Sequence, residues 1–129
     1  KGFFVDRTVL VLEGKTAHYL SIYKIAYVVP VGQGQKKAIV YLTNGTKITA
    51  TENPDDITSR LGDELFSMVN KKNRVVASTQ CIKGIKHDSD GRDILDLDPE
   101  PPFVIFPDED CIKLVQAMTN QKNGVVPGM

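Results

Sequence analysis

The 129-residue sequence has no excess of charge of either sign, no long hydrophobic run and no closely spaced cysteine pair. Lysine plus arginine and aspartate plus glutamate number 16 each, whereas dedicated nucleic-acid binders usually carry a basic excess. Any nucleic-acid contact would therefore need a local cluster of cations. No apolar stretch approaches the ~20 residues of a transmembrane helix, and residues 1–6 lack the long apolar core of a signal peptide. We predict a cytoplasmic protein with no membrane partner.

Cysteine usage does not indicate a disulfide-stabilised fold. Cys81 and Cys111 are far apart, and each precedes an isoleucine. This setting is typical of buried, reduced thiols, which we expect here. A disulfide between the two residues is the less favoured alternative.

The sequence also lacks the motifs of an enzyme or a metalloprotein. His18 and His87 have no partner at a known metal-ligand spacing. Residues 88–91, Asp-Ser-Asp-Gly, resemble the start of a calcium loop, but the glycine comes early and Arg92 occupies a ligand position, so we interpret them as a hairpin turn. No phosphate-binding glycine loop or nucleophile–base pair is present. We predict no catalytic residue, no metal site and no cofactor.

Length and composition predict one globular domain. Apolar residues make up 41% and charged residues 25% of the chain, both ordinary values. The first half consists of β-rich runs separated by turn residues, and Asn44-Gly45 between two of them is a strong hairpin signal because both turn positions favour positive φ. The strands predicted in this half are 8–12, 16–22, 25–29, 38–42 and 46–51.

A helix is predicted at 54–65, where an asparagine cap and a proline precede two carboxylates, and Ile57, Leu61 and Leu65 share one face. A second helix with an acidic start is predicted near 107–119. Further strands are expected at 75–78, 82–85, 94–97 and 103–106. The predicted fold class is α+β, with mostly antiparallel β-strands and two short helices. A single domain would span residues 1–120, followed by a flexible tail at 121–129.

The two halves of the chain share an order of elements, namely hairpin, strand and acidic helix start. Asp56-Ile57 in the first half is echoed by Cys111-Ile112 in the second. A diverged duplication is one interpretation of this order, and it stays open because the two halves share little sequence identity.

Two positive segments fall in predicted connections between β-strands. One follows the glycine-rich residues 32–35, and the other leads into the strand at 75–78. Lysine, arginine and asparagine side chains on loops are common phosphate contacts, although a solubilising surface patch is an equal alternative. The candidate DNA-binding residues are Lys36, Lys37, Asn70, Lys71, Lys72, Asn73 and Arg74.

Four motifs occur in a characteristic order: residues 22–28 (Ile-Tyr-Lys-Ile-Ala-Tyr-Val), 40–45 (Val-Tyr-Leu-Thr-Asn-Gly), 57–69 with its helix and Phe66, and 75–85 with Val75, Ile82 and Ile85. Their order resembles the LytTR-type DNA-binding domain, a compact β-rich module of transcription factors, over roughly residues 8–118. Where that family has a basic His-Arg-Ser stretch, this chain has Asn70, Lys71 and Lys72. Where a basic contact follows late in the family, this chain has carboxylates at 108–110.

The resemblance implies a non-enzymatic module that binds double-stranded DNA in a transcriptional regulator. The alternative is a protein–protein interaction or scaffold module, of a phage or accessory protein, with no nucleic-acid binding. The neutral charge and the acidic late segment favour this alternative. The strand at 8–12 contains no charge or proline, so it would leave a sheet edge open to its own sheet or to a weak homodimer.

Overall fold

The computed structural model describes residues 7–122, which form nine strands, two α-helices and three short 3-10 turns. The strands are β1 Thr8–Glu13, β2 Thr16–Ser21, β3 Ile25–Val31, β4 Lys37–Leu42, β5 Lys47–Ala50, β6 Phe66–Asn70, β7 Val75–Ser78, β8 Ile82–His87 and β9 Asp93–Leu97. The helices are α1 Pro54–Leu61 and α2 Glu109–Lys122, and the turns are η1 Ile22–Lys24, η2 Gln33–Gln35 and η3 Thr79–Cys81. All the strand pairings among these residues are antiparallel. The predicted α+β class is confirmed.

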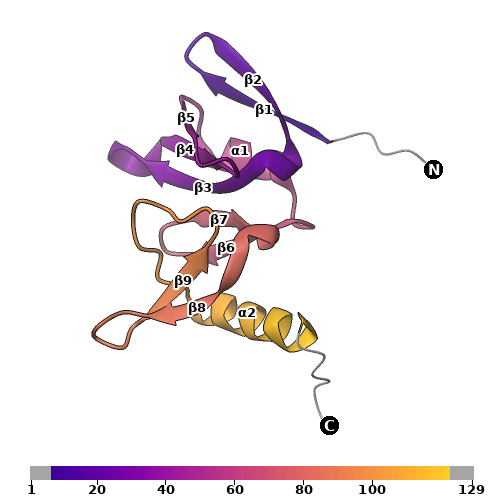
Figure 1. Ribbon diagram of the computed structural model, residues 1–129. Helices are drawn as coiled ribbons and strands as arrows, with labels where there is room; N and C mark the ends of the chain where they lie inside the picture. Colours follow the sequence, from indigo (N-terminus) through magenta and orange to yellow (C-terminus); the bar gives the residue numbers. More distant parts are fainter. Residues whose placement is uncertain (1–6, 123–129) are drawn as a thin grey trace, which may run out of the picture.

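A five-stranded sheet in the order β5-β4-β3-β7-β6 forms the centre, and the hairpins β1-β2 and β8-β9 lie on either side of it (Figure 1). Successive side chains of a strand point to opposite faces of a sheet. Val28 of β3 therefore enters one core, with residues of β1 and α1, whereas its neighbour Tyr27 enters a second core, with residues of β9 and α2. The sheet thus separates two apolar clusters. No helix in the described part of the chain is long and apolar enough to cross a membrane.

Local turn chemistry sets the element boundaries. Gly45 has φ 90° in the predicted β4–β5 hairpin turn, and the Asn44 side chain accepts the N–H of Thr46 at 3.0 Å. The Asn53 side chain caps α1 by accepting the N–H of Asp55 at 2.9 Å. The helix ends at Leu61, four residues earlier than predicted, because Gly62 has φ 75° and leaves the helical conformation.

Other elements also differ from the prediction. Strand β6 was missed. The predicted strand at 103–106 is not one, since among residues 7–122 its only backbone bond to a strand is from Leu95 N–H to the Ile105 carbonyl at 2.9 Å. Helix α2 begins two residues later than predicted and runs to Lys122, two residues into the predicted tail. Residues 123–129 lie outside the described part of the chain.

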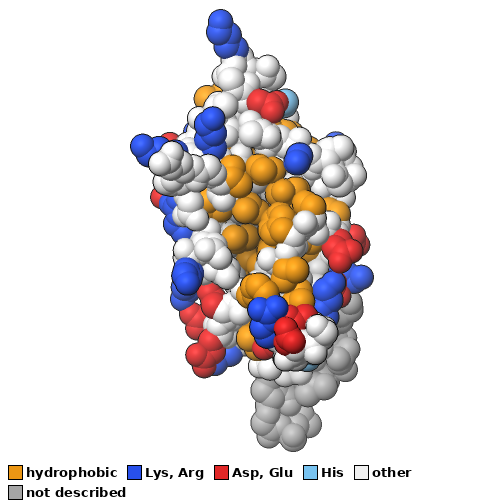
Figure 2. Space-filling view, turned by 90° about the vertical axis from the view of Figure 1, so that its left-hand side faces the viewer, with side chains coloured by type: hydrophobic (Ala, Val, Ile, Leu, Met, Phe, Trp, Pro, Cys, Tyr) orange, Lys and Arg blue, Asp and Glu red, His pale blue; other side chains and the backbone are white. Residues whose placement is uncertain are grey.

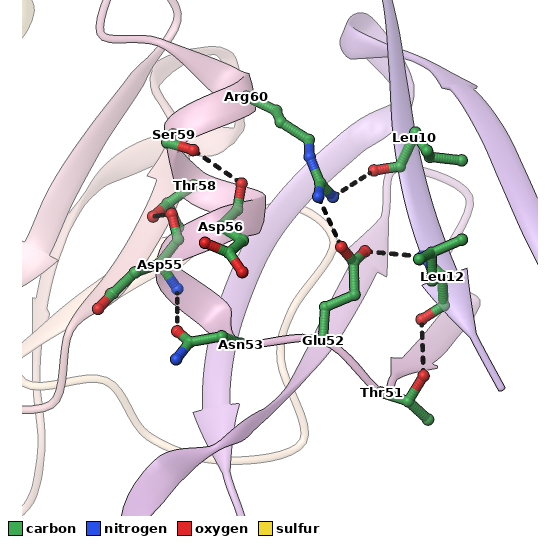
Figure 3. Close-up of polar contacts among 10 residues, drawn as sticks. All are labelled: Leu10, Leu12, Thr51, Glu52, Asn53, Asp55, Asp56, Thr58, Ser59 and Arg60. Carbon is green, nitrogen blue, oxygen red and sulfur yellow. Dashed lines mark hydrogen bonds and ion pairs between the residues drawn. The ribbon is translucent and has the colours of Figure 1, made fainter.

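The first strand pairs within its own sheet. This was one of the two predicted alternatives, the other being a weak homodimer. Its partner is β2, in a ladder from Thr8↔Ser21 to Glu13↔Thr16. Its other side is closed by side chains: Glu52 accepts the Leu12 N–H at 2.8 Å, and Arg60 donates to the Leu10 carbonyl at 2.9 Å (Figure 3). A homodimer through residues 8–12 is therefore not supported, because the N–H and C=O of Leu12 and the C=O of Leu10, which it would need, are already bonded.

The two halves of the chain share an order of elements: a hairpin, a serine-capped 3-10 turn, a second hairpin and a helix. The first half has an additional strand, β5, and its first hairpin is a separate sheet, whereas β6-β7 belongs to the central sheet. Each half contains an equivalent set of backbone hydrogen bonds. Ile22 N–H donates to the Arg7 carbonyl at 2.8 Å in the first half, and Thr79 N–H donates to the Leu65 carbonyl at 2.7 Å in the second. The carbonyl of the last residue of η1, and likewise that of η3, accepts a bond of 2.9 Å. The buried pair Ile57 and Leu61 in α1 corresponds to the buried pair Cys111 and Val115 in α2. The sequence comparison had matched Ile57 with Ile112, one residue further along the chain.

Candidate nucleic-acid interface

The two positive segments of the sequence lie side by side. Lys36 follows η2 in the β3–β4 connection and Lys37 begins β4, and residues 71–74 form the turn between β6 and β7. Arg74 joins the two, because its Nη2 donates to the Gln35 carbonyl at 3.2 Å and lies 3.4 Å from the Gln35 side-chain oxygen. A third segment, 106–110, meets the same turn through Asn70, whose Nδ2 donates to the Phe106 carbonyl at 2.8 Å. We call residues 32–37, 70–74 and 106–110 together the loop face.

Arg74 has a structural role in this arrangement. Its Nη1 lies 2.8 Å from both carboxylate oxygens of Asp55, in the first turn of α1. The backbone of Arg74 has φ 55°, a conformation that residues other than glycine seldom adopt. The guanidinium therefore ties the β6–β7 turn to α1 and to η2, and it is not free for a phosphate.

Lys71 is held in the same way by the start of α2. Its ammonium group pairs with Asp110, and its backbone N–H donates to Asp108 at 3.0 Å. The hydrogen bond to Asp110 raises the pKa of Lys71, and the same bond lowers the pKa of Asp110. Asn70 shapes the turn, since its side-chain oxygen accepts the N–H of Asn73 at 2.9 Å.

Four of the predicted contacts remain available to a ligand. The side chains of Lys36, Lys37 and Lys72 are exposed, and within residues 7–122 none of them makes a hydrogen bond or an ion pair. Asn73 is also exposed, and within residues 7–122 the hydrogen bond it makes uses its backbone N–H and not its side chain. The sequence thus located loops that carry exposed cations, but it did not show which of their cations are neutralised within the chain.

Sequence reasoning noted carboxylates at 108–110, but it missed the pairing of these carboxylates and of Asp55 with the cations. Asp55 comes from α1, and Asp108 and Asp110 come from the start of α2. Their signal was present as the acidic start of each predicted helix, a feature that the helix dipole favours at any helix N-terminus. The loop face contains five cationic and three acidic side chains, so it keeps a net charge of +2, which Asp55 beside it reduces further.

A solved structure with a similar fold is the LytTr DNA-binding domain of a methyl-accepting/DNA response regulator from Bacillus cereus. The superposition has a TM-score of 0.56 and covers 92% of this chain and 97% of that one. This chain has the LytTr fold. The sequence identity is 13%, so the likeness concerns the fold and not the site. No protein family and no curated protein matches the sequence.

The LytTr fold accounts for the motifs that carried the resemblance. Residues 22–28 form η1 and the start of β3, and residues 40–45 form the end of β4 and its turn. The basic stretch at 71–74 is the β6–β7 turn, within the loop face. The resemblance in fold is confirmed, and the departures at 70–72 and 108–110 fall on the loop face itself.

An apolar area adjoins these loops in the LytTr fold of this chain. Figure 2 shows hydrophobic side chains gathered in the middle of one face, with both cationic and acidic side chains around them. A cavity of about 210 Å³ lies between β3 and residues 103–106, and Gln35, Asn70 and Asn73 are among its lining residues. Val104 and Phe106 on its border are 53% and 40% exposed. The guanidinium of Arg92 lies 4.8 Å from the centre of the Phe106 ring.

The remaining titratable clusters are explained by strand pairing and turns. His18 pairs with Glu13 at 3.1 Å and His87 with Asp93 at 2.9 Å, both across hairpins. The Asp88 carboxylate accepts the N–H groups of Asp90 and Arg92, each at 2.9 Å, as expected of a turn. No group of three or more metal-binding side chains occurs in residues 7–122. Cys81 and Cys111 are free and buried, and burial raises the pKa of Cys111 to about 11.

Proposed function

We propose that the chain is a non-enzymatic, cytoplasmic DNA-binding module of a transcriptional regulator, which contacts the duplex through its loop face. The observation that supports it best is the convergence of three connections that are far apart in the sequence. Together they leave Lys36, Lys37 and Lys72 exposed and without an internal ion pair among the described residues. The name of the Bacillus cereus structure, a DNA-binding domain with the same fold, is in keeping with this proposal.

The three lysines would bind phosphate groups, and contacts of this kind position a protein on DNA without reading its sequence. The Asn73 amide, which is exposed beside Lys72, is the group best placed to reach a base edge. Asn70 does not share this role, because both ends of its side chain are already bonded within the chain. The carboxylates at 108–110 would oppose phosphate, so we expect weak binding that is lost as salt is added.

Exchange of the three lysines for alanine tests the proposal. Binding of the K36A/K37A/K72A variant to a random duplex, measured by fluorescence anisotropy at low ionic strength, should weaken by more than about tenfold. A matched control removes the same charge elsewhere: Lys15, Lys24 and Lys47 are exposed and lie outside the loop face. The K15A/K24A/K47A variant should bind within about twofold of the native chain. Equal losses in both variants would show that binding does not use the loop face.

A second function, docking of a protein partner, is supported by the exposed side chains of Val104 and Phe106 beside the cavity. Isolated exposed apolar residues are common, but a contiguous patch is typical of an interaction surface. The Val104→Ser variant separates the two functions. It should leave DNA affinity unchanged, because Val104 carries no charge and lies outside the loop face, whereas it should weaken a protein complex at the patch.

A further inference from the structure

The hairpin β1-β2 has one closed edge and one open edge. In an antiparallel pair, alternate residues direct their N–H and C=O groups away from the partner strand. On β1 these residues include Leu10 and Leu12, which bond to Arg60 and Glu52 on the closed side (Figure 3). Their ladder partners on β2 are Tyr19 and Ala17, which must direct their own N–H and C=O groups to the outer side of β2.

No other strand of the described chain pairs with β2 on this outer side. Proteins usually protect such edges with charge, proline or a covering element. Strand β2, Thr-Ala-His-Tyr-Leu-Ser, contains no proline, lysine, arginine, aspartate or glutamate. Tyr19 in its centre is 72% exposed, the largest exposure among the large hydrophobic side chains of the described residues. The outer edge of β2 is therefore open, uncharged and carries an exposed aromatic ring.

We propose that two copies of this chain associate through β2, in an antiparallel pair centred on Tyr19, so that two β1-β2 hairpins form one four-stranded sheet. A second copy fits because the edge is complementary to itself. About a two-fold axis at Tyr19, each Tyr19 faces its counterpart, each Ala17 faces Ser21 of the second copy, and no like charges are opposed. In each copy the outward N–H and C=O groups of Tyr19 and Ala17 bond to the strand of the other copy.

This dimer differs from the one expected through residues 8–12, and it does not depend on DNA binding. The hairpin contributes no residue to the loop face, so each copy keeps its own loop face available. The contact is a short one, formed by a single strand of six residues from each copy, so we expect a weak, concentration-dependent dimer.

Proline at position 17 tests the ladder directly. Ala17 is exposed and its N–H points outward, so Ala17→Pro removes a donor of the dimer ladder and none of the β1-β2 ladder. The matched control, Ala17→Ser, keeps this donor. By sedimentation velocity, the native chain and A17S should show the same concentration-dependent dimer, and A17P should remain a monomer with an unchanged circular dichroism spectrum. A native chain that stays monomeric at millimolar concentration, or an A17P dimer of native strength, would overturn the proposal.

A cysteine at position 19 gives a second test that does not depend on how proline affects folding. Opposed residues in an antiparallel pair have α-carbons about 5.5 Å apart, within the range that a disulfide spans. Tyr19→Cys should therefore give a covalent dimer under mild oxidation. Thr16→Cys, an exposed control on the same strand, would lie far from its counterpart and should stay monomeric. The native cysteines are buried and should add little background. Equal cross-linking of both variants would contradict pairing centred on Tyr19.

Discussion

Replacing Glu52 with glutamine should destabilise the chain by weakening the closed edge of β1. The carboxylate of Glu52 is 8% exposed, lies 2.7 Å from Arg60 and accepts the Leu12 N–H at 2.8 Å. Glutamine keeps an acceptor for Leu12 but loses the charge that pairs with Arg60. A hydrogen bond to a charged group is worth about 1.5–3 kcal/mol. Because Arg60 is 34% exposed and can turn toward water, we expect the lower end, about 1.5 kcal/mol.

The expected change in melting temperature follows from the size of the domain. For 129 residues, about 1.5 kcal/mol corresponds to a decrease of roughly 5 °C in Tm. Thermal unfolding followed by circular dichroism at neutral pH measures it. The matched control is Glu64→Gln, because Glu64 is exposed and makes no ion pair within residues 7–122. This control should melt within about 1 °C of the native chain.

The pH dependence supplies a second check on Glu52. The hydrogen bond from Arg60 is the main cause that lowers the pKa of Glu52 in the folded state. The folded state therefore gains stability from this group above the ordinary glutamate pKa of about 4.3, and loses it as the pH falls through the lower folded value. The difference in Tm between the native chain and E52Q should be complete at neutral pH and shrink below about pH 4. The reasoning would be refuted if the difference in Tm were absent at neutral pH, or if it were the same at neutral pH and below about pH 4.

Three further predictions concern the loop face, the end of α1 and the thiols. Asp110→Asn should release Lys71 and so tighten DNA binding, with a slope of log affinity against log salt that is steeper by about one. Anisotropy titrations measure both quantities, and a fall in affinity would disprove the release. Gly62→Ala should cost about 1–3 kcal/mol in urea unfolding, because Gly62 has φ 75° and ψ −174°, a region open essentially to glycine alone, whereas an unchanged midpoint would contradict this. Cys81 and Cys111 should react with a thiol reagent at pH 8 only after unfolding, since both are buried and burial raises both pKa values, and rapid reaction of the native chain would be inconsistent with this burial.

The parts of the fold that the sequence predicts are those set by local chemistry. Asn44-Gly45 and the Asn53 cap act within a few residues, so the hairpin and the start of α1 could be located without tertiary information. Strand β6 was missed because a register shift between Met68 and Asn70 breaks the two-residue alternation that identifies a half-buried strand. The segment 103–106 has the composition of a strand, but prolines at 102 and 107 flank it and a ladder cannot continue through them, and within residues 7–122 it makes a single backbone bond to a strand.

The candidate site shows the same limit at longer range. The positive residues of the loops are visible in the sequence, and so are the carboxylates at 55, 108 and 110. Their pairing is not visible, since Arg74 and Asp55 are 19 residues apart and Lys71 and Asp110 are 39 apart. Only the folded chain shows that two of the five candidate cations are held internally and that Lys36, Lys37 and Lys72 are not.

The salt dependence of binding to a random DNA duplex tests the proposed function most directly. Each phosphate neutralised on duplex DNA contributes about −0.9 to the slope of log affinity against log salt. Three free lysines on the loop face therefore predict a slope of about −2.7 for the native chain. The measurement is a series of anisotropy titrations from low to physiological ionic strength. A slope near that value supports DNA binding by the loop face, and a complex that is undetectable at low salt, or insensitive to salt, would contradict it.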